Sequence, residues 1–294
     1  MSQQDRPDGW AVIGMGRAGR IRMRCLNEHP DLGSIIPCSR REHTHPSFGD
    51  ILADEAIGGV FICRESGSHP DDVRRALNAG KHVLVEYPLA FSRDEGRRLF
   101  ELARKNQCVL HVGYLGLLTG WAGSIKDIIR QNKPSSAVYR FQAGFGSVPQ
   151  ADVQNGRLGT MILARIQQLI AWFGQVQLEE CKASQSAHGV SVEVTFRSSA
   201  GCLINFSESR LINQQRTRCL ALQNHVGHPI DVPAWYGDPR VFLTDTNCFI
   251  DRCFGRARNG SWIDEEAVLH GLTLAEAISK GLNSKDERAG ARDV

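Results

Sequence analysis

A short glycine-rich segment near the start of the chain constrains the fold more than any other feature of the sequence. Directly after the first apolar run, the pattern G-x-G-x-x-G is formed by Gly14, Met15, Gly16, Arg17, Ala18 and Gly19. Only glycine lets the backbone turn tightly enough to bring bare amide groups against a pyrophosphate, and a following helix start adds positive potential. The alternative is an ordinary glycine-rich turn, since the chain has 29 glycines. A strand before the pattern and a helix after it favour a dinucleotide-binding loop made of these six residues.

The first 118 residues alternate short apolar runs with amphipathic stretches. We expect strands at 10–13, 34–38, 59–63, 82–85 and 108–112, and helices at 18–27, 70–79 and 92–106. Ser92 and Glu95 have the spacing of a capping box at the start of the last helix. Strands that alternate with helices are typical of a parallel sheet with crossover helices. The sequence therefore predicts an α/β fold that begins with a Rossmann-type, doubly wound parallel sheet over residues 1–118.

The pattern changes after residue 120. Apolar and polar residues alternate strictly over 190–196, which predicts a strand with one face in water. Further strand candidates at 202–206 and 218–223 have little helix between them, so we expect a mostly antiparallel open sheet. Apolar residues at helical spacing predict helices at 158–173 and 264–280.

These patterns define the remaining domain boundaries. We predict a second α/β domain over 119–282 that makes the substrate side of the protein. Its last helix is expected to return to the first domain. The polar segment 283–294 is expected to be a frayed, flexible tail.

Composition excludes several classes of protein. Hydrophobic residues make up 41% of the chain, and no apolar run approaches the roughly 18 residues of a membrane span. The polar start lacks the features of a secretory signal, so we expect a cytoplasmic protein with no membrane partner. Nine cysteines without a C-x-x-C pair indicate reduced thiols. A net charge of +3 argues against nucleic acid as a partner and is compatible with an anionic small molecule. Histidine pairs lack a third ligand at suitable spacing, so we expect no metal.

The end of the second expected strand bears on the choice of cofactor. An acidic residue there would accept hydrogen bonds from the adenosine ribose and favour NAD, but this chain has Ser39, Arg40 and Arg41. The planar fork of arginine matches a phosphate on that ribose. We therefore expect NADPH as cofactor, with weaker binding of NADH. The alternative is a solvated basic turn in which Glu42 pairs with either arginine.

One segment carries a specific family resemblance. Residues 76–90 read ALNAGKHVLVEYPLA and follow a polar loop that contains Ser66 and His69. This segment resembles the glucose-fructose oxidoreductase-like dehydrogenases, in which AGKHVLxEKP leads to the nicotinamide pocket. Tyr87 departs from that pattern, since the sugar dehydrogenases carry a catalytic lysine there. The motif VEYP instead resembles the biliverdin reductases, a narrower group of the family, and this similarity covers nearly the whole chain.

The resemblance implies a reaction and a set of site residues. The reaction is NADPH-dependent hydride transfer to the central methine carbon of biliverdin, which gives bilirubin. Tyr87 is placed beside the nicotinamide, as a proton donor or a positioning group, and Arg165 grips a propionate or acidifies a water. Glu86 orients a neighbouring donor or touches the cofactor, while Ser66 and His69 line the nicotinamide side.

Each of these roles has a structural alternative. Tyr87 can fill a domain junction, and Arg165, at the border of an apolar helix stripe, can extend its charge to solvent. Glu86 can belong to an ion pair. A helix-start cap is the simpler explanation for Ser66 and His69.

Departures from the resemblance leave other functions open. The biliverdin reductases usually carry two glutamates and a histidine where this chain has Gly113, Tyr114 and Gly116. A catalytically weak NADP(H)-binding sensor is favoured by this loss of two carboxylates. A dehydrogenase of sugars or dihydrodiols is the other alternative, although Tyr87 in place of lysine argues against it. The cysteine pairs that the mammalian enzymes associate with zinc are missing after His270, which also predicts no zinc. The oligomeric state is left open.

Overall fold

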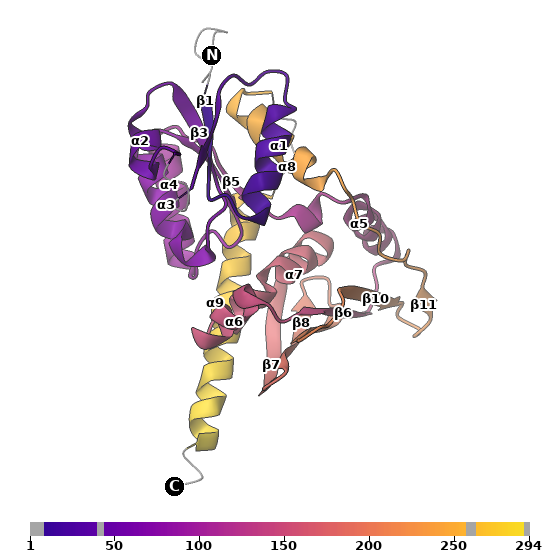
Figure 1. The fold of residues 1–294 in the computed structure, drawn as a ribbon. Helices are drawn as coiled ribbons and strands as arrows, with labels where there is room; N and C mark the ends of the chain where they lie inside the picture. Colours follow the sequence, from indigo (N-terminus) through magenta and orange to yellow (C-terminus); the bar gives the residue numbers. More distant parts are fainter. Residues whose placement is uncertain (1–8, 40–43, 257–262, 291–294) are drawn as a thin grey trace. The chain divides into compact units, whose positions relative to one another are not determined.

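The computed structural model describes residues 9–39, 44–256 and 263–290, and the chain divides into two compact units (Figure 1). The first unit comprises 1–118 and 238–265, and the second comprises 119–237 and 266–294. The segment 238–265, which the sequence analysis placed in the second domain, therefore belongs to the first unit.

The first unit is built on a sheet of five parallel strands in the order β2-β1-β3-β4-β5. The strands are β1 (Gly9–Ile13), β2 (Ile35–Cys38), β3 (Ile57–Ile62), β4 (His82–Glu86) and β5 (Leu110–Gly113). The helices are α1 (Arg17–Asn27), α2 (Phe48–Ala53), α3 (His69–Asn78), α4 (Arg93–Lys105) and α8 (Val241–Cys253), with short 3-10 turns at Ser66–Ser68 and Leu115–Leu117. Figure 1 shows α2, α3 and α4 on one face of the sheet and α1 and α8 on the other. Because both faces are covered, the strands are nearly continuous apolar runs, and the predicted Rossmann-type sheet is confirmed.

Helix α8 joins the first unit through its apolar face. Phe249 is fully buried and packs edge-on against Trp10 of β1 and Phe61 of β3, at ring-centroid distances of 5.8 and 5.2 Å. Ile250 and Cys253 are buried in the same cluster. The segment 238–265 was assigned to the second domain because of its position in the chain. Burial of the apolar side chains of α8 instead favours the packing of this helix beside α1.

The start of α4 forms part of the predicted capping box. Ser92 Oγ accepts a hydrogen bond from the Glu95 backbone N–H at 3.3 Å. The Glu95 carboxylate accepts from the backbone N–H of Phe91, also at 3.3 Å, one residue before the partner that the motif predicts. The helix start is therefore stabilised by both side chains.

The second unit is built on a six-stranded sheet in the order β11-β10-β6-β9-β8-β7. The strands are β6 (Ser136–Gly144), β7 (Val176–Ser186), β8 (Gly189–Ser198), β9 (Leu203–Leu211), β10 (Thr217–Gln223) and β11 (Pro229–Ile230). The helices are α5 (Gly120–Asn132), α6 (Ser147–Gln154), α7 (Leu158–Phe173) and α9 (Glu265–Gly290). Each pairing is antiparallel except that of β6 with β9, so the predicted mostly antiparallel sheet is confirmed.

Helices α7 and α9 approach each other closely. The backbone N–H of Gly159 donates to Ser279 Oγ at 3.0 Å, and a Cβ at residue 159 would stand only 1.9 Å from the carbonyl oxygen of Ala275. From Glu266 onward α9 belongs to the second unit. The predicted return of this helix to the first domain stays a prediction. The helix also continues into the segment 283–294 that was predicted as a frayed tail.

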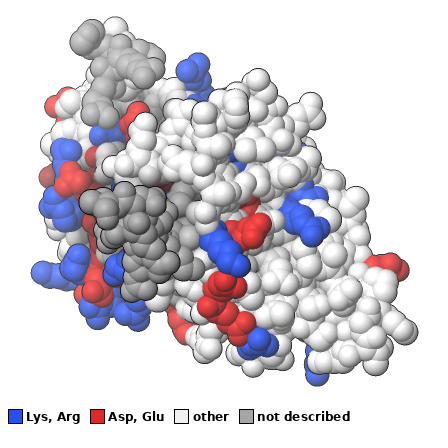
Figure 2. All heavy atoms as spheres, turned by 90° about the horizontal axis from the view of Figure 1, so that it is seen from below, with Lys and Arg blue, Asp and Glu red and all other residues white. Residues whose placement is uncertain are grey.

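All nine cysteines are free thiols. Within the described ranges, no helix is both long enough and apolar enough to cross a membrane. Figure 2 shows one face of the molecule, on which, outside the grey residues, Lys and Arg side chains are interspersed with Asp and Glu. Positive charge on this face is therefore locally balanced.

Candidate active site

The predicted phosphate loop has the geometry that its glycines suggest. Gly14 has a φ of +98°, in the region that favours glycine, and a Cβ at Gly19 would stand 1.9 Å from the Gly14 carbonyl oxygen. Gly16 is the N-cap of α1, and apart from its chain neighbours no atom lies within 4 Å of where its Cβ would be. The first turn of α1 holds neither an acidic residue nor a side-chain cap. The loop therefore fits a pyrophosphate, because its glycines allow close approach and the helix start presents backbone N–H groups.

The residues expected to select the cofactor follow this loop in space. The Gly14 backbone N–H donates to the carbonyl oxygen of Cys38 at 2.9 Å, which places the end of β2 beside the loop. Ser39 comes next and is partly buried. Arg40 and Arg41 lie outside the described residues, so their role in NADPH binding stays a prediction.

Tyr87 follows the last residue of β4 and begins the turn at Pro88. The Tyr87–Pro88 peptide bond is cis. The Tyr87 ring is partly exposed and stacks on the buried ring of Tyr114, with centroids 5.5 Å apart and planes at 17°. Tyr114 thus supports the side chain that the sequence placed beside the nicotinamide. Tyr114 was expected only as a departure from the resemblance, and its contact with Tyr87 was not predicted.

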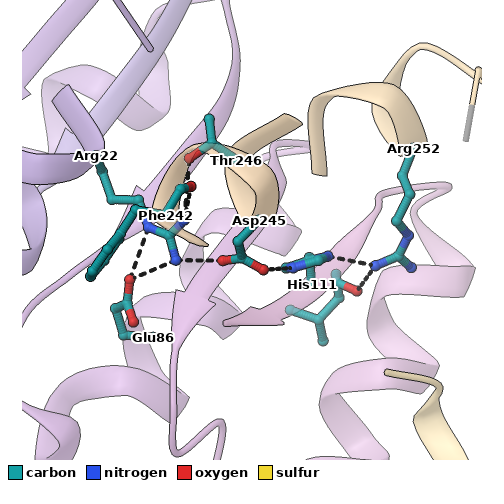
Figure 3. Close-up of polar contacts among 8 residues, drawn as sticks. Arg22, Glu86, His111, Phe242, Asp245, Thr246 and Arg252 are labelled. Atoms are coloured by element: carbon teal, nitrogen blue, oxygen red, sulfur yellow. Dashed lines mark hydrogen bonds and ion pairs between the residues drawn. The ribbon is translucent and has the colours of Figure 1, made fainter. Parts of the chain in front are cut away.

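Glu86 belongs to a buried polar network that gathers residues from four elements (Figure 3). Its centre is Arg22 of α1, which is fully buried and donates through Nε to Glu86 Oε1 at 2.9 Å and through Nη2 to Asp245 Oδ2 at 2.5 Å. The Arg22 Nη1 group donates to the Phe242 carbonyl oxygen and to Thr246 Oγ1, at 3.1 and 3.2 Å. Glu86 therefore forms an ion pair, which was the structural alternative for this residue, and its partner is Arg22.

The network continues from Asp245 of α8 to β5. Asp245 Oδ1 lies 2.7 Å from His111 Nε2, and Arg252 Nη1 donates to His111 Nδ1 at 3.2 Å. Because an arginine N–H can only donate, Nδ1 must accept, and Nε2 carries the hydrogen that Asp245 receives. This arrangement corresponds to the tautomer of His111 that has its hydrogen on Nε2. Arg252 also donates to the Leu110 carbonyl oxygen at 3.2 Å, which anchors α8 to the sheet.

The two carboxylates of this network have opposite pKa shifts. Burial raises the pKa of Glu86, and the attraction of Arg22 only partly offsets it. Burial also acts to raise the pKa of Asp245, but His111 and Arg22 outweigh it, so this pKa lies below its ordinary value. Asp245 is therefore the fixed anion of the network, and Glu86 is the carboxylate that takes up a proton more easily.

Sequence reasoning missed Asp245 and His111 as members of the site. Asp245 lies 223 residues from Arg22 in the chain, and no local motif joins them. A signal was present at Arg22, because this permanent charge falls on the buried face of an amphipathic helix and requires a partner.

Gly113 leaves the space into which this network fits. A Cβ at this position would stand 3.0 Å from Arg22 Nη2, 3.3 Å from Asp245 Oδ2 and 3.4 Å from Glu86 Oε2. Any larger side chain at residue 113 would therefore displace charged groups of the network. The Asp245 carboxylate lies close to this position, where the resemblance leads one to expect a glutamate.

His69 and Ser66 lie between β3 and α3. The buried His69 ring joins two backbone segments, since Nδ1 lies 2.8 Å from the Pro88 carbonyl oxygen and Nε2 lies 2.9 Å from that of Arg64. Ser66 begins a 3-10 turn and is partly buried. The N-cap of α3 is Ser68, so neither residue is the cap that the simpler explanation required.

Arg165 lies in the second unit, on α7, and is 5% exposed. Its Nε and Nη2 groups donate to the two oxygens of Glu208 at 2.7 and 3.0 Å, and Nη2 also donates to the Met161 carbonyl oxygen at 3.0 Å. The partner of this charge, Glu208 of β9, was not predicted from the sequence. Arg165 is held inside the unit rather than extended to solvent.

The chain is similar to known oxidoreductases. Residues 9–114 match the model of the oxidoreductase family with an NAD-binding Rossmann fold. Biliverdin reductase A of Homo sapiens is 31% identical, over 95% of this chain and 97% of the human protein. The chain belongs to the biliverdin reductase A family. Biliverdin reductase A of Mus musculus is 28% identical with the same coverage.

A solved structure supports the fold. The crystal structure of biliverdin reductase from Synechocystis sp. PCC 6803, in complex with biliverdin and NADP+, superposes with a TM-score of 0.73 at 22% identity. The match covers 94% of this chain and 99% of that one. Family membership confirms the predicted resemblance and the enzyme class, an NAD(P)H-dependent oxidoreductase.

Proposed function

We propose that this protein reduces biliverdin to bilirubin with NADPH as the hydride donor. The observation that carries the proposal is similarity to the human and mouse biliverdin reductases A over 95% of the chain. The Synechocystis biliverdin reductase, whose crystal structure is a complex with biliverdin and NADP+, supports the same substrate and cofactor. The motif VEYP supports the same substrate, because the lysine of the sugar dehydrogenases is absent.

The reaction needs few groups from the protein. NADPH, when bound, supplies a hydride to the central methine carbon of biliverdin, a pyrrole nitrogen gains a proton from solvent or an acid, and bilirubin and NADP+ result. The loop at Gly14, Gly16 and Gly19 would hold the pyrophosphate. The Tyr87 hydroxyl would donate a hydrogen bond or the proton to the bilin, and its stacking on Tyr114 fixes the ring.

Glu86, one residue before Tyr87 in the chain, would orient a neighbouring donor or touch the cofactor. Arg22 binds Oε1 of Glu86 and so fixes the direction of the side chain, which is 15% exposed. Burial raises the pKa of Glu86, so its protonated form is favoured more than that of an exposed carboxylate.

The proposal is tested by mixing the purified protein with NADPH and biliverdin and following bilirubin absorbance. We expect bilirubin to form in proportion to the NADPH oxidised. Tyr87→Phe should lower kcat about 100-fold if the hydroxyl donates the proton, while the affinity for NADPH stays unchanged. Absence of bilirubin with intact NADPH binding would refute the proposal.

The preference for NADPH is tested separately with the double variant Arg40→Ala and Arg41→Ala. Each lost charge-assisted hydrogen bond to phosphate is worth about 1.5–3 kcal/mol, so affinity for NADPH should fall by about 100-fold or more. Affinity for NADH should change only a few-fold, because NADH lacks the ribose phosphate. Equal losses for both cofactors, measured by fluorescence titration, would contradict the phosphate role of these arginines.

A catalytically weak NADP(H)-binding sensor is the second candidate. The observation that favours it is Gly113, which brings no carboxylate to the Arg22 network. Cofactor binding without turnover of biliverdin, sugars or dihydrodiols would support the sensor.

A further inference from the structure

The imidazole ring of His69 lies between two backbone segments of the first unit. The residue is 1% exposed, and its ring nitrogens lie 2.8 Å from the Pro88 carbonyl oxygen and 2.9 Å from the Arg64 carbonyl oxygen. Both polar atoms of the ring are therefore directed at backbone. Any role of His69 in the reaction acts through these two segments.

The first segment is the turn that follows Tyr87. Pro88 has no backbone N–H, so this turn lacks one of the donors that usually fix a turn. His69 Nδ1 makes a side-chain contact with the carbonyl group of this same proline. Pro88 is buried, whereas the Tyr87 ring is partly exposed. The contact with His69 therefore lies at the buried end of a turn that presents Tyr87 at the surface.

The second segment packs against the predicted phosphate loop. Arg64 lies just after β3, and a Cβ at Gly14 would stand 3.0 Å from its backbone nitrogen. The Arg64 backbone is thus in close contact with the first glycine of the loop. Through its two nitrogens, the His69 ring sets the spacing between the Tyr87 turn and the backbone that borders this loop.

Both contacts require a hydrogen on the ring. A carbonyl oxygen only accepts, so this arrangement corresponds to the form of His69 that has a hydrogen on each nitrogen, which is a cation. An anion is available to this cation at the end of β4. Burial raises the pKa of Glu86, and both Arg22 and His69 act to lower it. The other charged side chains of this region are paired, and they are Arg22, Asp245, Arg64 and Asp72.

We propose that His69 is a positioning residue for Tyr87 and that it acts through N–H groups on both ring nitrogens. Nδ1 holds the Pro88 carbonyl group, and Nε2 holds the Arg64 carbonyl group beside the phosphate loop. A group that takes part in a reaction must be held near its productive geometry, since a displacement of about 1 Å can lower the rate about 100-fold. The inference rests on the proposed function for the part that Tyr87 plays.

The two ring hydrogens are tested in the parent protein with isotope-labelled histidine. Nitrogen NMR spectra distinguish ring nitrogens that carry a hydrogen from those that do not, and the signals of His69 are those lost in His69→Asn. At the neutral pH of the activity assay, both nitrogens of His69 should carry a hydrogen. A single ring hydrogen would overturn the inference.

Two substitutions each retain one of the contacts. The side-chain nitrogen of asparagine can replace Nδ1 and that of glutamine can replace Nε2, so His69→Asn keeps a donor for Pro88 and His69→Gln keeps one for Arg64. His69→Gln should lower kcat for biliverdin about tenfold or more, whereas His69→Asn should lower it less than about threefold. In both variants, KM for biliverdin and the affinity for NADPH should change less than kcat.

The position of Tyr87 is measured without turnover. The chain has four tyrosines, so the ring signals of labelled tyrosine are few, and Tyr87→Phe identifies the signal of Tyr87. Stacking on Tyr114 shifts this signal, and Tyr114→Leu shows where it lies without the stack. In His69→Gln the signal should move toward its position in Tyr114→Leu, and in His69→Asn it should stay near that of the parent.

His82→Gln is the matched control. His82 begins β4, at the opposite end from Tyr87, and its Nδ1 accepts from the backbone N–H of Val109 at 3.0 Å. This substitution also breaks a contact between a histidine ring and backbone, but it should leave kcat and the Tyr87 signal unchanged. Circular dichroism checks that each variant is folded.

The outcomes separate this inference from the proposed function. An unchanged Tyr87 signal or an unchanged kcat in His69→Gln overturns the positioning role, and so do equal effects of the two His69 substitutions. If the parent forms no bilirubin, the proposed function is refuted and the Tyr87 signal decides alone. A signal that moves in His69→Gln and stays in His69→Asn then supports His69 as the residue that positions Tyr87.

Discussion

Two buried arginines, one in each unit, have opposite electrostatic surroundings. Arg22 in the first unit binds two carboxylates, Glu86 and Asp245, whereas Arg165 in the second unit binds one carboxylate, Glu208, which it shares with Arg210. The first centre therefore holds two anions around one cation. The second holds two cations around one anion.

The difference indicates what each centre is suited to do. In the first, His111 and Arg252 complete a network that balances its own charge and fixes Glu86 beside Tyr87. In the second, Glu208 pairs with two arginines at once, so its single charge is divided between two guanidinium groups. Burial alone would not have distinguished the two arginines, since both are almost inaccessible to solvent.

The largest effect is expected from removing each arginine in turn. Arg22→Met leaves two buried carboxylates without their cation and should lower the free energy of unfolding by about 3–5 kcal/mol. Arg165→Met should cost less, about 2–3 kcal/mol, because Arg210 still pairs with Glu208. Urea denaturation measures both losses.

Arg24→Met is the control for the first variant, since Arg24 lies on the exposed side of the same helix. Its effect should stay within about 0.5 kcal/mol. If Arg22→Met were no more harmful than Arg165→Met, the contrast between the two centres would be wrong.

Stability measured over a pH series should distinguish carboxyl groups of the two units, because the pKa of Asp245 is lowered and that of Asp152, on α6, is raised. The pKa of Asp245 is lowered in the folded protein, so this group stabilises the fold above its ordinary pKa and that contribution is lost as pH falls through the folded pKa. Burial raises the pKa of Asp152 from 3.8 to about 6 in the folded protein. Its contribution to the free energy of unfolding is therefore fully present below pH 3.8 and is lost as the pH rises through 6.

Two neutral variants measure this difference. At pH 8, Asp245→Asn should be less stable than the parent by about 3 kcal/mol, whereas Asp152→Asn should be more stable by at most about 3 kcal/mol. At pH 4 the effect of Asp152→Asn should vanish, because the parent's carboxyl is then neutral in the folded state. A stabilisation by Asp152→Asn that does not grow between pH 4 and pH 8 would contradict the assignment.

The smallest effect on stability is expected from filling the space at Gly113, next to the Arg22 network. Gly113→Ala places a methyl group 3.0 Å from Arg22 Nη2 and should destabilise the protein by about 1–2 kcal/mol. Gly123→Ala in α5 meets no atom within 4 Å other than its chain neighbours and the backbone of its own helix, and should instead stabilise by about 0.5–1 kcal/mol. Thermal unfolding compares them, and a neutral Gly113→Ala would mean that the network has room for a side chain.

The parts of the fold that the sequence predicted correctly depend on neighbours in the chain. The phosphate loop, the five parallel strands and the cap at Ser92 follow from glycine spacing, apolar periodicity and local hydrogen bonding. The alternation over 190–196 gave β8, but β6 and β7 were not predicted. The segment 238–265 was assigned by its position in the chain, and the burial of Phe249 against Trp10 places it elsewhere.

In the candidate site, too, some features were predictable from the sequence and others depended on the tertiary structure. The sequence by itself determined that Glu86 and Tyr87 directly follow the strand expected at 82–85, and that an arginine lies at residue 165 of an apolar helix. Only the tertiary structure decided their partners, since Asp245 is 223 residues from Arg22 and Glu208 is 43 residues from Arg165. The physical reason is that a buried charge requires a counter-charge, but which residue supplies it depends on how distant elements pack, and no local pattern records that choice.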